Sequence, residues 1–469
     1  MKLWGGRFAD GGRDSLFEEF SESFSLDQRL ILYDLRVNQV YVKQLAAAGG
    51  LKKEEARRLA GGLEAIRREI RKNPHWARGQ RSEDVHTWVE ARLERALGAL
   101  AGKLRTGRSR NDLVATETRL FAKDAIDALE RAALEALEAL ASLGRRHSGV
   151  VMPGYTHLQP AQPILFSHYA LAYFEMLSRD VSRFEDCRVR ADELPMGAGA
   201  LAGTTFPIDR AALARELGFA RVSANSLDVT SDRDFVCELL FACSLALMHL
   251  SRLAEDLILY SSPAFGYIEI ADEYSTGSSL MPQKKNADSL ELIRGKAARV
   301  LGRVTGALAM MKGLPMAYNR DLQEDKAALF DGVDTTRASL AVAARVLRTL
   351  RLNPEKMEAA THLGFLTATD VADELVRRDM TFAAAHGAVG KLVRHCVKKS
   401  KTFADLSEEE ARAVISLWDK RLARIAASPR LTIGQRNVTG GTARAQVARQ
   451  MARADRSVQQ LRRRLAVRS

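Results

Sequence analysis

One segment constrains the fold more than any other, because residues 235–250 are apolar on nearly every side of the helix that they predict. Only Glu238, Ser244 and His249 interrupt the apolar run. A helix that is apolar on every side in a soluble protein must be buried on every side. The run is shorter than the roughly 20 apolar residues that a membrane span needs, and charged residues bracket it. We therefore expect a buried core helix over about 231–261, packed between subunits as well as within one, and no membrane partner.

The length and composition of the chain predict several helical domains. A chain of 469 residues exceeds the size at which a single core stops growing. Its 11 prolines are few for that length, and Ala, Leu, Glu and Arg are abundant, which favours helices. Beyond about Ala360 the pattern changes to shorter, basic helices. We expect an all-α chain with an N-terminal helical domain (1–107), a central helical bundle (108–360) and a small basic helical domain (361–469).

The positive charge is concentrated at the end of the chain. The formal net charge is +13, and the residues from Lys391 onward hold 19 Lys and Arg against 6 Asp and Glu. A basic tail is one mark of nucleic-acid binding. This tail has few aromatic residues for stacking, only Phe403 and Trp418, and its arginines are spread along helical sequence. We therefore expect no nucleic-acid partner, and two roles stay open: steering of an anionic ligand, or a solubility surface.

The cysteines and the first residues bear on location. Cys187, Cys237, Cys243 and Cys396 show neither C-x-x-C spacing nor a pairing pattern, which is typical of thiols in a reducing compartment. Residues 1–7 lack the apolar region of an export signal. A cytoplasmic protein is expected.

The stretch from Gly277 to Asn286 predicts a functional loop. Small residues fill its start, Pro282 interrupts any helix, and a helical pattern resumes at about Asp288. Two hydroxyls, two ammonium groups and an amide within ten residues suit a site that binds an anion and moves a proton. The alternative is an ordinary solvated polar loop. The groups in question are Ser278, Ser279, Lys284, Lys285 and Asn286.

Two further stretches combine rigid backbone with reactive side chains. In residues 102–112 a Ser/Asn cluster flanked by Arg begins a helix, which supplies N–H donors and positive charge for a carboxylate. Simple helix capping is the alternative.

In residues 152–163 three prolines predict a rigid turn between helices, and His157 follows Thr156 there. A fixed imidazole suits proton transfer, although a lone His in a turn is usually structural.

Three weaker patterns involve helix starts. Ser82 is a possible cap for the helix that carries Asp84 and His86, and two residues at this spacing point in different directions, which argues against a shared metal site. On its own, His86 reads as a surface residue. Asp288 with Glu291 reads as a capping box. Gln323 and Lys326 share a helix face, a pair that is usually solvated.

Residues 197–203 hold three glycines but do not form a nucleotide loop. No strand precedes them, the spacing differs from G-x-G-x-x-G, and no Gly-Lys-Ser/Thr follows. We interpret the segment as a close-packed loop.

The motifs together resemble a known family. The run Gly-Ser-Ser-Leu-Met-Pro-Gln-Lys-Lys-Asn is similar to the signature of the fumarase/aspartase superfamily, whose members eliminate fumarate from a substituted succinate. Ala287 stands where that signature commonly continues with Pro, which loosens the entry to the next helix without removing a chemical group. Residues 106–112, 155–163 and 283–285 resemble the argininosuccinate lyase branch, and the similarity runs from the Trp-Gly-Gly-Arg-Phe of residues 4–8 to the last domain.

The resemblance implies a reaction and an assembly. It implies reversible cleavage of argininosuccinate to arginine and fumarate by anti elimination, an activity of arginine biosynthesis, with no metal and no organic cofactor. It also implies a central long-helix bundle that assembles into a twenty-helix homotetramer core, with each active site shared between subunits. Adenylosuccinate lyase, fumarase or aspartase activity is the nearest alternative, and an inactive structural protein on the same fold, as some crystallins are, is another.

The resemblance also assigns roles to individual residues. Ser278 is the implied base, with Ser279 as the alternative, and Lys284 and Asn286 stabilise the aci-carboxylate intermediate. His157, paired with Glu291, is the implied general acid. The implied substrate-binding residues are His86, Ser109, Arg110, Asn111, Thr156, Arg233, Tyr318, Gln323 and Lys326.

Overall fold

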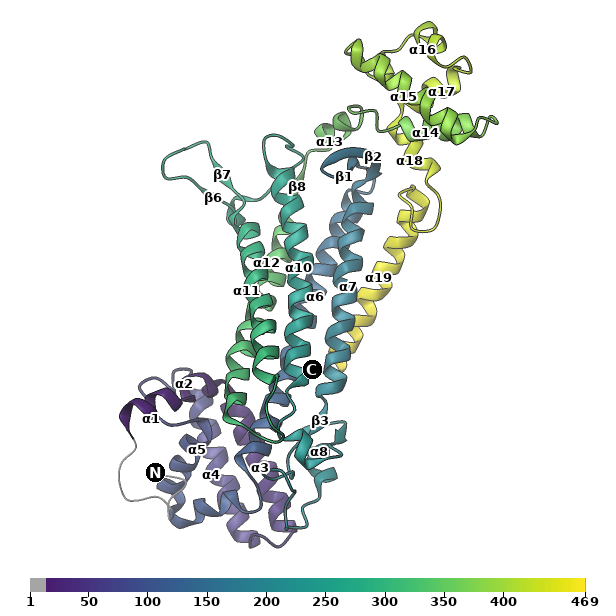
Figure 1. Cartoon of the computed structure of the whole chain (residues 1–469). Helices are drawn as coiled ribbons and strands as arrows, with labels where there is room; N and C mark the ends of the chain where they lie inside the picture. Colours follow the sequence, from purple (N-terminus) through teal and green to yellow (C-terminus); the bar gives the residue numbers. More distant parts are fainter. Residues whose placement is uncertain (1–13, 469) are drawn as a thin grey trace. The chain divides into compact units, whose positions relative to one another are not determined.

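The computed structural model describes residues 14–468, and its chain is mainly helical (Figure 1). The predicted all-helical class is confirmed. Residues 1–7 and the motif at residues 4–8, both used in the sequence analysis, lie outside the described residues. The helices are α1 (Ser15–Ser21), α2 (Phe24–Asp27), α3 (Ile31–Ala47), α4 (Lys53–Lys72), α5 (Val85–Leu97), α6 (Arg110–Arg146), α7 (Phe166–Ala191), α8 (Arg210–Leu217), α9 (Ser226–Val229), α10 (Asp234–Ser261), α11 (Asp288–Met311), α12 (Asp325–Thr349), α13 (Pro354–Thr361), α14 (Ala368–Val376), α15 (Phe382–Lys398), α16 (Glu408–Val414), α17 (Lys420–Ala427), α18 (Pro429–Gln435) and α19 (Arg444–Val467).

The strands are short and pair two by two. β1 with β2 is an antiparallel hairpin, β6 with β7 and β5 with β8 are antiparallel pairs of two residues each, and β3 with β4 is parallel. Such small ladders connect helices and form no layer of their own. The strands are β1 (Val151–Thr156), β2 (Gln159–Leu165), β3 (Glu193–Leu194), β4 (Arg221–Val222), β5 (Ile268–Glu269), β6 (Thr276–Gly277), β7 (Lys285–Asn286) and β8 (Arg351–Leu352).

Internal contacts divide the chain into two compact units. The first unit holds residues up to 129, 182–245 and 298–336, and the second holds 130–181, 246–297 and 337–469. Helices α6, α7, α10, α11 and α12 contribute residues to both units. The division into three domains, made from composition and motifs, stays a prediction.

The N-terminal helices of the first unit form their core by regular apolar spacing. In α4 the buried residues are Ala56, Leu59, Leu63, Ile66 and Ile70, which recur every three or four positions and so lie on one face. These side chains join a cluster with residues of α3 and α5. Each fully buried Leu or Ile contributes about 1.5–3 kcal/mol relative to an exposed one. This core holds α3 and α5 in place, and both helices carry residues of the site described below.

Helix α10 is longer than the apolar run from which it was predicted. It has 28 residues, and Phe235, Leu239 and Leu240 are buried. By length and composition it is long enough to cross a membrane, a test that a buried core helix also passes, and 56% of its most apolar window is buried. Phe241 and Met248, seven residues apart, remain 52% and 44% exposed. Within one chain, therefore, the helix keeps one apolar face uncovered.

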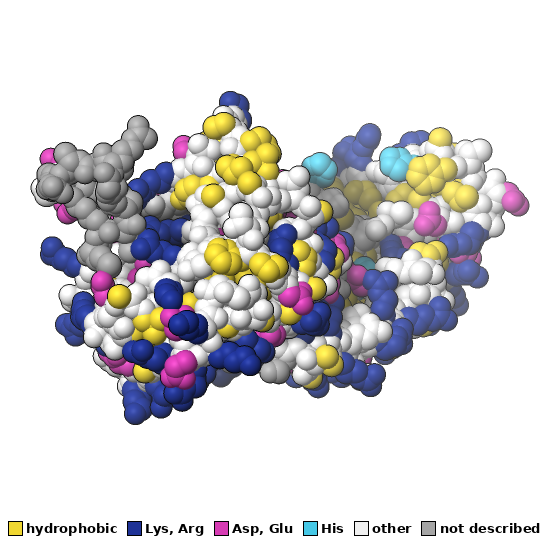
Figure 2. Space-filling view, turned by 90° about the horizontal axis from the view of Figure 1, so that it is seen from below, with side chains coloured by type: hydrophobic (Ala, Val, Ile, Leu, Met, Phe, Trp, Pro, Cys, Tyr) yellow, Lys and Arg dark blue, Asp and Glu magenta, His cyan; other side chains and the backbone are white. Residues whose placement is uncertain are grey.

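Three of the seven arginines of α19 in the second unit form ion pairs with acids of α6 or α7. Arg462 contacts Glu138, and Arg464 and Arg468 both contact Glu130, a fully buried carboxylate of α6. Arg453 contacts Glu175 of α7 in the same way. On the face of the molecule shown in Figure 2, Lys and Arg side chains are spread out, with Asp and Glu side chains among them. These ion pairs hold α19 against α6 and α7.

Candidate active site

The start of α6 combines a helix cap with a half-buried cation, Arg110. The Ser109 hydroxyl accepts a hydrogen bond from the Asn111 N–H at 3.2 Å, so Ser109 does cap the helix. The Arg110 guanidinium lies 2.6 Å from Asp84, the residue that caps α5 by accepting from the Thr87 N–H. Asp84, not Ser82 as predicted, is therefore the cap of α5, because the helix begins at Val85.

A cavity of about 310 Å³ opens beside this helix start in the first unit. It is large enough for a ligand of the size of an amino acid derivative. Six of the predicted substrate-binding residues line it although they come from three distant segments: His86, Arg110, Asn111, Tyr318, Gln323 and Lys326. The fold thus gathers residues that the sequence analysis placed together only by resemblance. Ser109 lies next to two of them in the chain, and Thr156 belongs to the second unit.

His86 is buried, not exposed as its local sequence suggested. Its Nδ1 lies 2.6 Å from Oδ2 of Asp34 on α3, an acidic partner 52 residues away that no local pattern indicates. Since His86 also lines the cavity, its Nε2 is the nitrogen available to a ligand. Burial lowers the pKa of His86, but the hydrogen bond to Asp34 and the charges of Asp84 and Asp34 outweigh burial and raise it. The imidazolium form, a donor from both nitrogens, therefore persists to a higher pH than in an ordinary histidine.

Asp34, His86 and Glu117 together form a buried cluster. Among the described residues, their potential ligand atoms lie within 4.8 Å of one another, the arrangement of a possible metal site. The 2.6 Å distance between Nδ1 of His86 and Oδ2 of Asp34 is that of a hydrogen bond. Burial, with the nearby charge of Asp34, raises the pKa of Glu117 well above its usual range. The raised pKa of Glu117 favours its neutral form, which lowers the negative charge of the cluster.

Lys326 is held in place by a buried acid. Its Nζ lies 2.8 Å from Oδ1 of Asp325, whose Oδ2 accepts from Nε of Arg233. Burial alone would raise the pKa of Asp325, but the charges of Lys326 and Arg233 outweigh burial, and the pKa is lowered. Arg233 itself is fully buried and does not line the cavity. Within one chain it acts on Lys326 through Asp325, and its direct contact with substrate stays a prediction.

The cavity also contains residues that the sequence analysis missed. Ser23, Asp27, Glu83 and Arg320 line it. The Ser23 hydroxyl donates to one carboxylate oxygen of Asp27 at 2.5 Å, and the other oxygen is buried without a partner in the described part of the chain. Burial raises the pKa of Asp27. No sequence motif marks α2, so Ser23, which precedes this four-residue helix, and Asp27, which ends it, were found only from the packing of the helix.

His157 lies at the tip of the β1–β2 hairpin, not in a turn between helices as predicted. His157 and Leu158 form the two-residue turn, and both have left-handed backbone, with φ of 55° and 58°. Positive φ at both positions is the type I′ geometry, which is unfavourable for residues other than Gly, Asn or Asp. The strands next to the turn hold it rigid. The His157 side chain is exposed and forms no hydrogen bond with any described residue.

The signature loop is closed by the β6–β7 pair. Thr276 pairs with Asn286 and Gly277 with Lys285, and residues 278–284 form the loop between them. The Ser278 hydroxyl oxygen accepts from the N–H groups of Leu280 and Met281 at 3.2 and 3.0 Å. Ser279 is exposed and makes no such bonds in the described chain. The predicted loop is confirmed, and its first hydroxyl has a defined environment.

The two lysines of this loop differ. Lys285 lies 2.6 Å from Asp272 and 3.2 Å from Glu269, and the hydrogen bond from Lys285 to Asp272 raises the pKa of Lys285. Lys284 is exposed and has no ion pair with any residue that the structure describes. Lys284 is therefore the ammonium group available to a ligand.

Glu291 does not take part in a capping box. Helix α11 begins at Asp288, so Ala287 is the cap, and the N–H groups of Leu290 and Glu291 bond to its carbonyl. The Asp288 carboxylate instead accepts from Thr276 of β6. Glu291 is exposed, and no hydrogen bond or ion pair joins it to His157 within the described chain.

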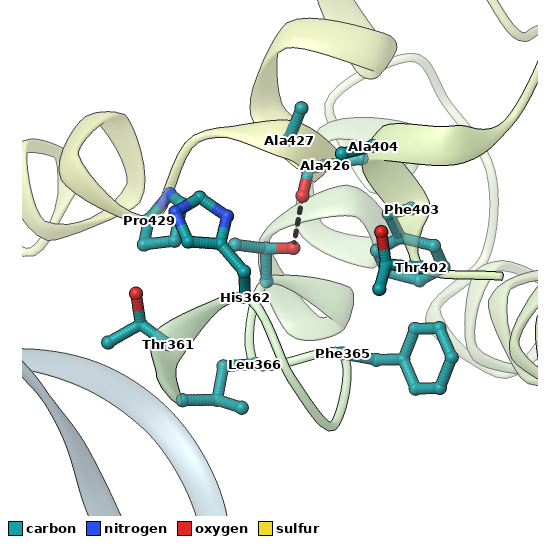
Figure 3. A pocket seen from close by; sticks show the side chains of 11 residues that line it. Thr361, His362, Phe365, Leu366, Thr402, Phe403, Ala404, Ala426, Ala427 and Pro429 are labelled. Atoms are coloured by element: carbon teal, nitrogen blue, oxygen red, sulfur yellow. Dashed lines mark hydrogen bonds between the residues drawn. The ribbon is translucent and has the colours of Figure 1, made fainter. Parts of the chain in front are cut away.

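A second, much smaller cavity lies in the second unit (Figure 3). It is lined by the ends of α13 and α17, the segment 365–367 before α14, the first residue of α18 and the short 3-10 helix Phe403–Asp405. It has a volume of about 10 Å³, room for roughly one water molecule. The Thr367 hydroxyl, one of the polar groups that line it, donates to the Ala426 carbonyl at 2.7 Å. This cavity is too small for a substrate.

Comparisons with known proteins agree with this arrangement. The profile of a family described as "Lyase" matches residues 6–302, and one described as "Argininosuccinate lyase C-terminal" matches residues 365–431. A solved structure of EDDS lyase in complex with formate is 28% identical, with a TM-score of 0.86 over 97% of this chain and 92% of that one. A class II fumarase from Schistosoma mansoni, 17% identical with a TM-score of 0.73 over 85% of this chain and 90% of that one, shares the fold. The fold and the signature loop thus define a lyase of the fumarase/aspartase superfamily.

Sequence relatives narrow the class. A protein from Moorella thermoacetica named argininosuccinate lyase is 48% identical over 97% of each chain. One of the same name from Symbiobacterium thermophilum is 48% identical over 96% of this chain and 97% of its own. This chain belongs to the argininosuccinate lyase family.

Proposed function

We propose a mechanism for the reaction of this family, the reversible cleavage of argininosuccinate to arginine and fumarate in arginine biosynthesis. The enzyme removes a proton from the carbon next to a carboxylate of the succinyl part, and the bond to the guanidino nitrogen then breaks. The intermediate is a doubly charged aci-carboxylate, which requires fixed positive charge and N–H donors. The observation that carries the assignment is the set of six predicted binding residues around one cavity.

Ser278 is the proposed base. Its oxygen accepts two backbone N–H groups, and the same bonds would stabilise an alkoxide after the hydroxyl proton has left. Lys284 and Asn286, on the same loop, are proposed to stabilise the intermediate. The loop is exposed in one chain and must close over the substrate before such a base can act.

His157 is the proposed general acid, which protonates the departing guanidino nitrogen. The rigid hairpin tip fixes the position of its imidazole, and Thr156 precedes it as a substrate contact. Glu291 is the proposed partner of His157. Since the two residues have no contact within one chain, we assign the partner Glu291 to a different subunit.

The proposed assembly is a homotetramer that shares its active sites. Apolar side chains remain uncovered on two long helices: Phe241 and Met248 on α10, and Leu292, Leu301 and Leu308 on α11, the last three 54–61% exposed. Exposed apolar faces of this kind mark interfaces. Free thiols at Cys187, Cys243 and Cys396, all buried, support the cytoplasmic location. The pairing of α19 arginines with α6 and α7 supports the absence of a nucleic-acid partner.

The test of the activity is the absorbance of released fumarate when purified protein is mixed with argininosuccinate. Adenylosuccinate, malate and aspartate serve as competing substrates under the same conditions. The proposal predicts fumarate from argininosuccinate and none from the others at equal enzyme concentration. Turnover of adenylosuccinate alone would assign the site to another branch of the superfamily.

A further inference from the structure

The glycine-rich segment 197–203 is fastened to the start of α6. The Asp112 side chain is fully buried, and its Oδ2 accepts from the N–H of Gly197 at 3.0 Å and of Gly199 at 2.9 Å. Its Oδ1 accepts from the Ser109 N–H at 3.0 Å. One carboxylate therefore joins two segments that lie about 85 residues apart in the chain.

The loop can reach this carboxylate because of its glycines. Gly197 and Gly199 have φ of 92° and 63°, a backbone that side chains disfavour. A Cβ on Gly199 would lie 2.4 Å from the Gly203 carbonyl oxygen, so any larger residue must move the loop. The Asn111 amide adds a weaker bond to the Ala200 carbonyl at 3.4 Å. The glycines thus allow the backbone to approach Asp112. The sequence indicated a close-packed loop here but not this contact.

We propose that Asp112 is a positioning residue for substrate binding: its carboxylate, accepting from the Ser109, Gly197 and Gly199 N–H groups, holds Arg110 and Asn111 at the cavity. The proposal rests on the substrate-binding role proposed above for Arg110 and Asn111. A carboxylate has two acceptor oxygens, whereas a carboxylic acid uses one of its oxygens as a donor and cannot accept all three N–H groups. Protonation of Asp112 therefore loosens the segment that carries the two cavity residues.

The surroundings of Asp112 place this protonation near neutral pH. Burial raises the pKa of Asp112 to about 6, although the three N–H bonds and the charge of Arg108 act in the opposite direction. The other ionisable groups that face it are Tyr41 of α3 and Arg210 of α8. Arg210 bonds to the Met196 carbonyl, next to the loop. Because the ionised form is the one that binds three N–H groups, KM is expected to rise as pH falls through about 6.

The test compares Asp112→Asn with the unmodified enzyme across pH. At about pH 8, where Asp112 is ionised, Asp112→Asn should raise KM for argininosuccinate about 10-fold or more, with kcat within about threefold. The rise in KM of the unmodified enzyme below about pH 6 should be absent from Asp112→Asn, whose side chain does not titrate. A KM rise of equal size and midpoint in both proteins overturns the proposal.

Two variants separate positioning from general damage. Gly199→Ala displaces the loop but keeps Asp112 titratable, so it should raise KM and retain the dependence on pH. Asp209→Asn makes the same chemical change at an exposed aspartate that accepts one backbone N–H, from Ala212, and should leave KM unchanged. If Asp112→Asn fails to fold, a flat KM between about pH 5 and about pH 8 in the unmodified enzyme still overturns the proposal.

One further variant distinguishes failure of this proposal from failure of the assigned site. Arg110→Ala removes a cavity residue directly. A raised KM in Arg110→Ala with a normal KM in Asp112→Asn overturns the positioning role alone. A normal KM in Arg110→Ala shows that the cavity does not bind the substrate, and the positioning role then fails with it.

Discussion

The cavity of the first unit and the two reactive segments of the second unit are built in opposite ways. Around the cavity, His86, Arg110 and Lys326 are each held by an acid within 2.8 Å, and their positions are set by the folding of one chain. In the second unit, His157 and Lys284 lie on an exposed hairpin tip and an exposed loop and have no ion pair with any described residue. The folding of one chain therefore fixes the proposed substrate-binding residues, whereas the proposed catalytic residues remain exposed until another subunit covers them.

The largest predicted effect concerns the base. Ser278→Ala should lower kcat by about 10³-fold or more, because no other group on the loop replaces a positioned base, while KM changes little. Fumarate release under saturating argininosuccinate measures it. Ser279→Ala is the matched control and should stay near the activity of the unmodified enzyme. The reverse pattern would move the role of base by one residue.

The two lysines of the loop offer a sharper version of the same comparison. Lys284→Ala should lower kcat by about 10²–10³-fold, the usual effect of removing one stabilising donor from an intermediate. Lys285→Ala removes only exposed ion pairs with Asp272 and Glu269, so its effect should be small. Steady-state kinetics of both variants measures the two values of kcat. An equal loss of kcat in Lys284→Ala and Lys285→Ala would contradict the different roles given to the two lysines.

Local patterns predicted some of these features better than others. The loop at 277–286 was recognisable from Pro282 and its small residues, and α10 from the apolar run at residues 235–250. The hairpin tip was not, because His-Leu is not a sequence that favours a type I′ turn. The buried state of His86 depends on Asp34, and the cavity on Ser23 and Asp27, through packing between segments that no local pattern connects.

The caps at Asp84 and Ala287 differ from the predicted ones at Ser82 and Asp288 by one or two residues, the usual uncertainty of a helix start.

A buried ion pair behind the cavity gives the next prediction. Arg233→Ala leaves Asp325 buried with Lys326 as its remaining cation, and should lower the free energy of unfolding by about 3 kcal/mol. Urea titration followed by circular dichroism measures it. Asp321→Asn, an exposed acid of the short helix before α12, is the control for charge removal. Unchanged stability together with a raised KM would instead make Arg233 a direct contact with substrate.

The smallest predicted effect concerns the basic C-terminal helix. Argininosuccinate and fumarate are anionic, so a positive field could steer them to the site. Salt screens such a field beyond a Debye length of about 8–10 Å, and steering would therefore make kcat/KM fall as salt is added. Because Arg462 is already paired with Glu138, replacing Arg462 and Arg463 by Gln should leave the salt slope of kcat/KM unchanged. Stability should change by less than about 1 kcal/mol. A flatter slope in the double variant would assign these arginines to steering.

In the proposed tetramer each active site combines His157 of one subunit with Lys284 of another, and this sharing can be tested by subunit mixing. His157→Asn and Lys284→Ala, each inactive alone, are co-expressed and purified as mixed tetramers, with fumarate release as the measurement. If the residues come from different chains, about one site in four should hold both unmodified side chains and regain activity. Mixed tetramers as inactive as the two single variants, or an active monomer in light scattering, would contradict the account.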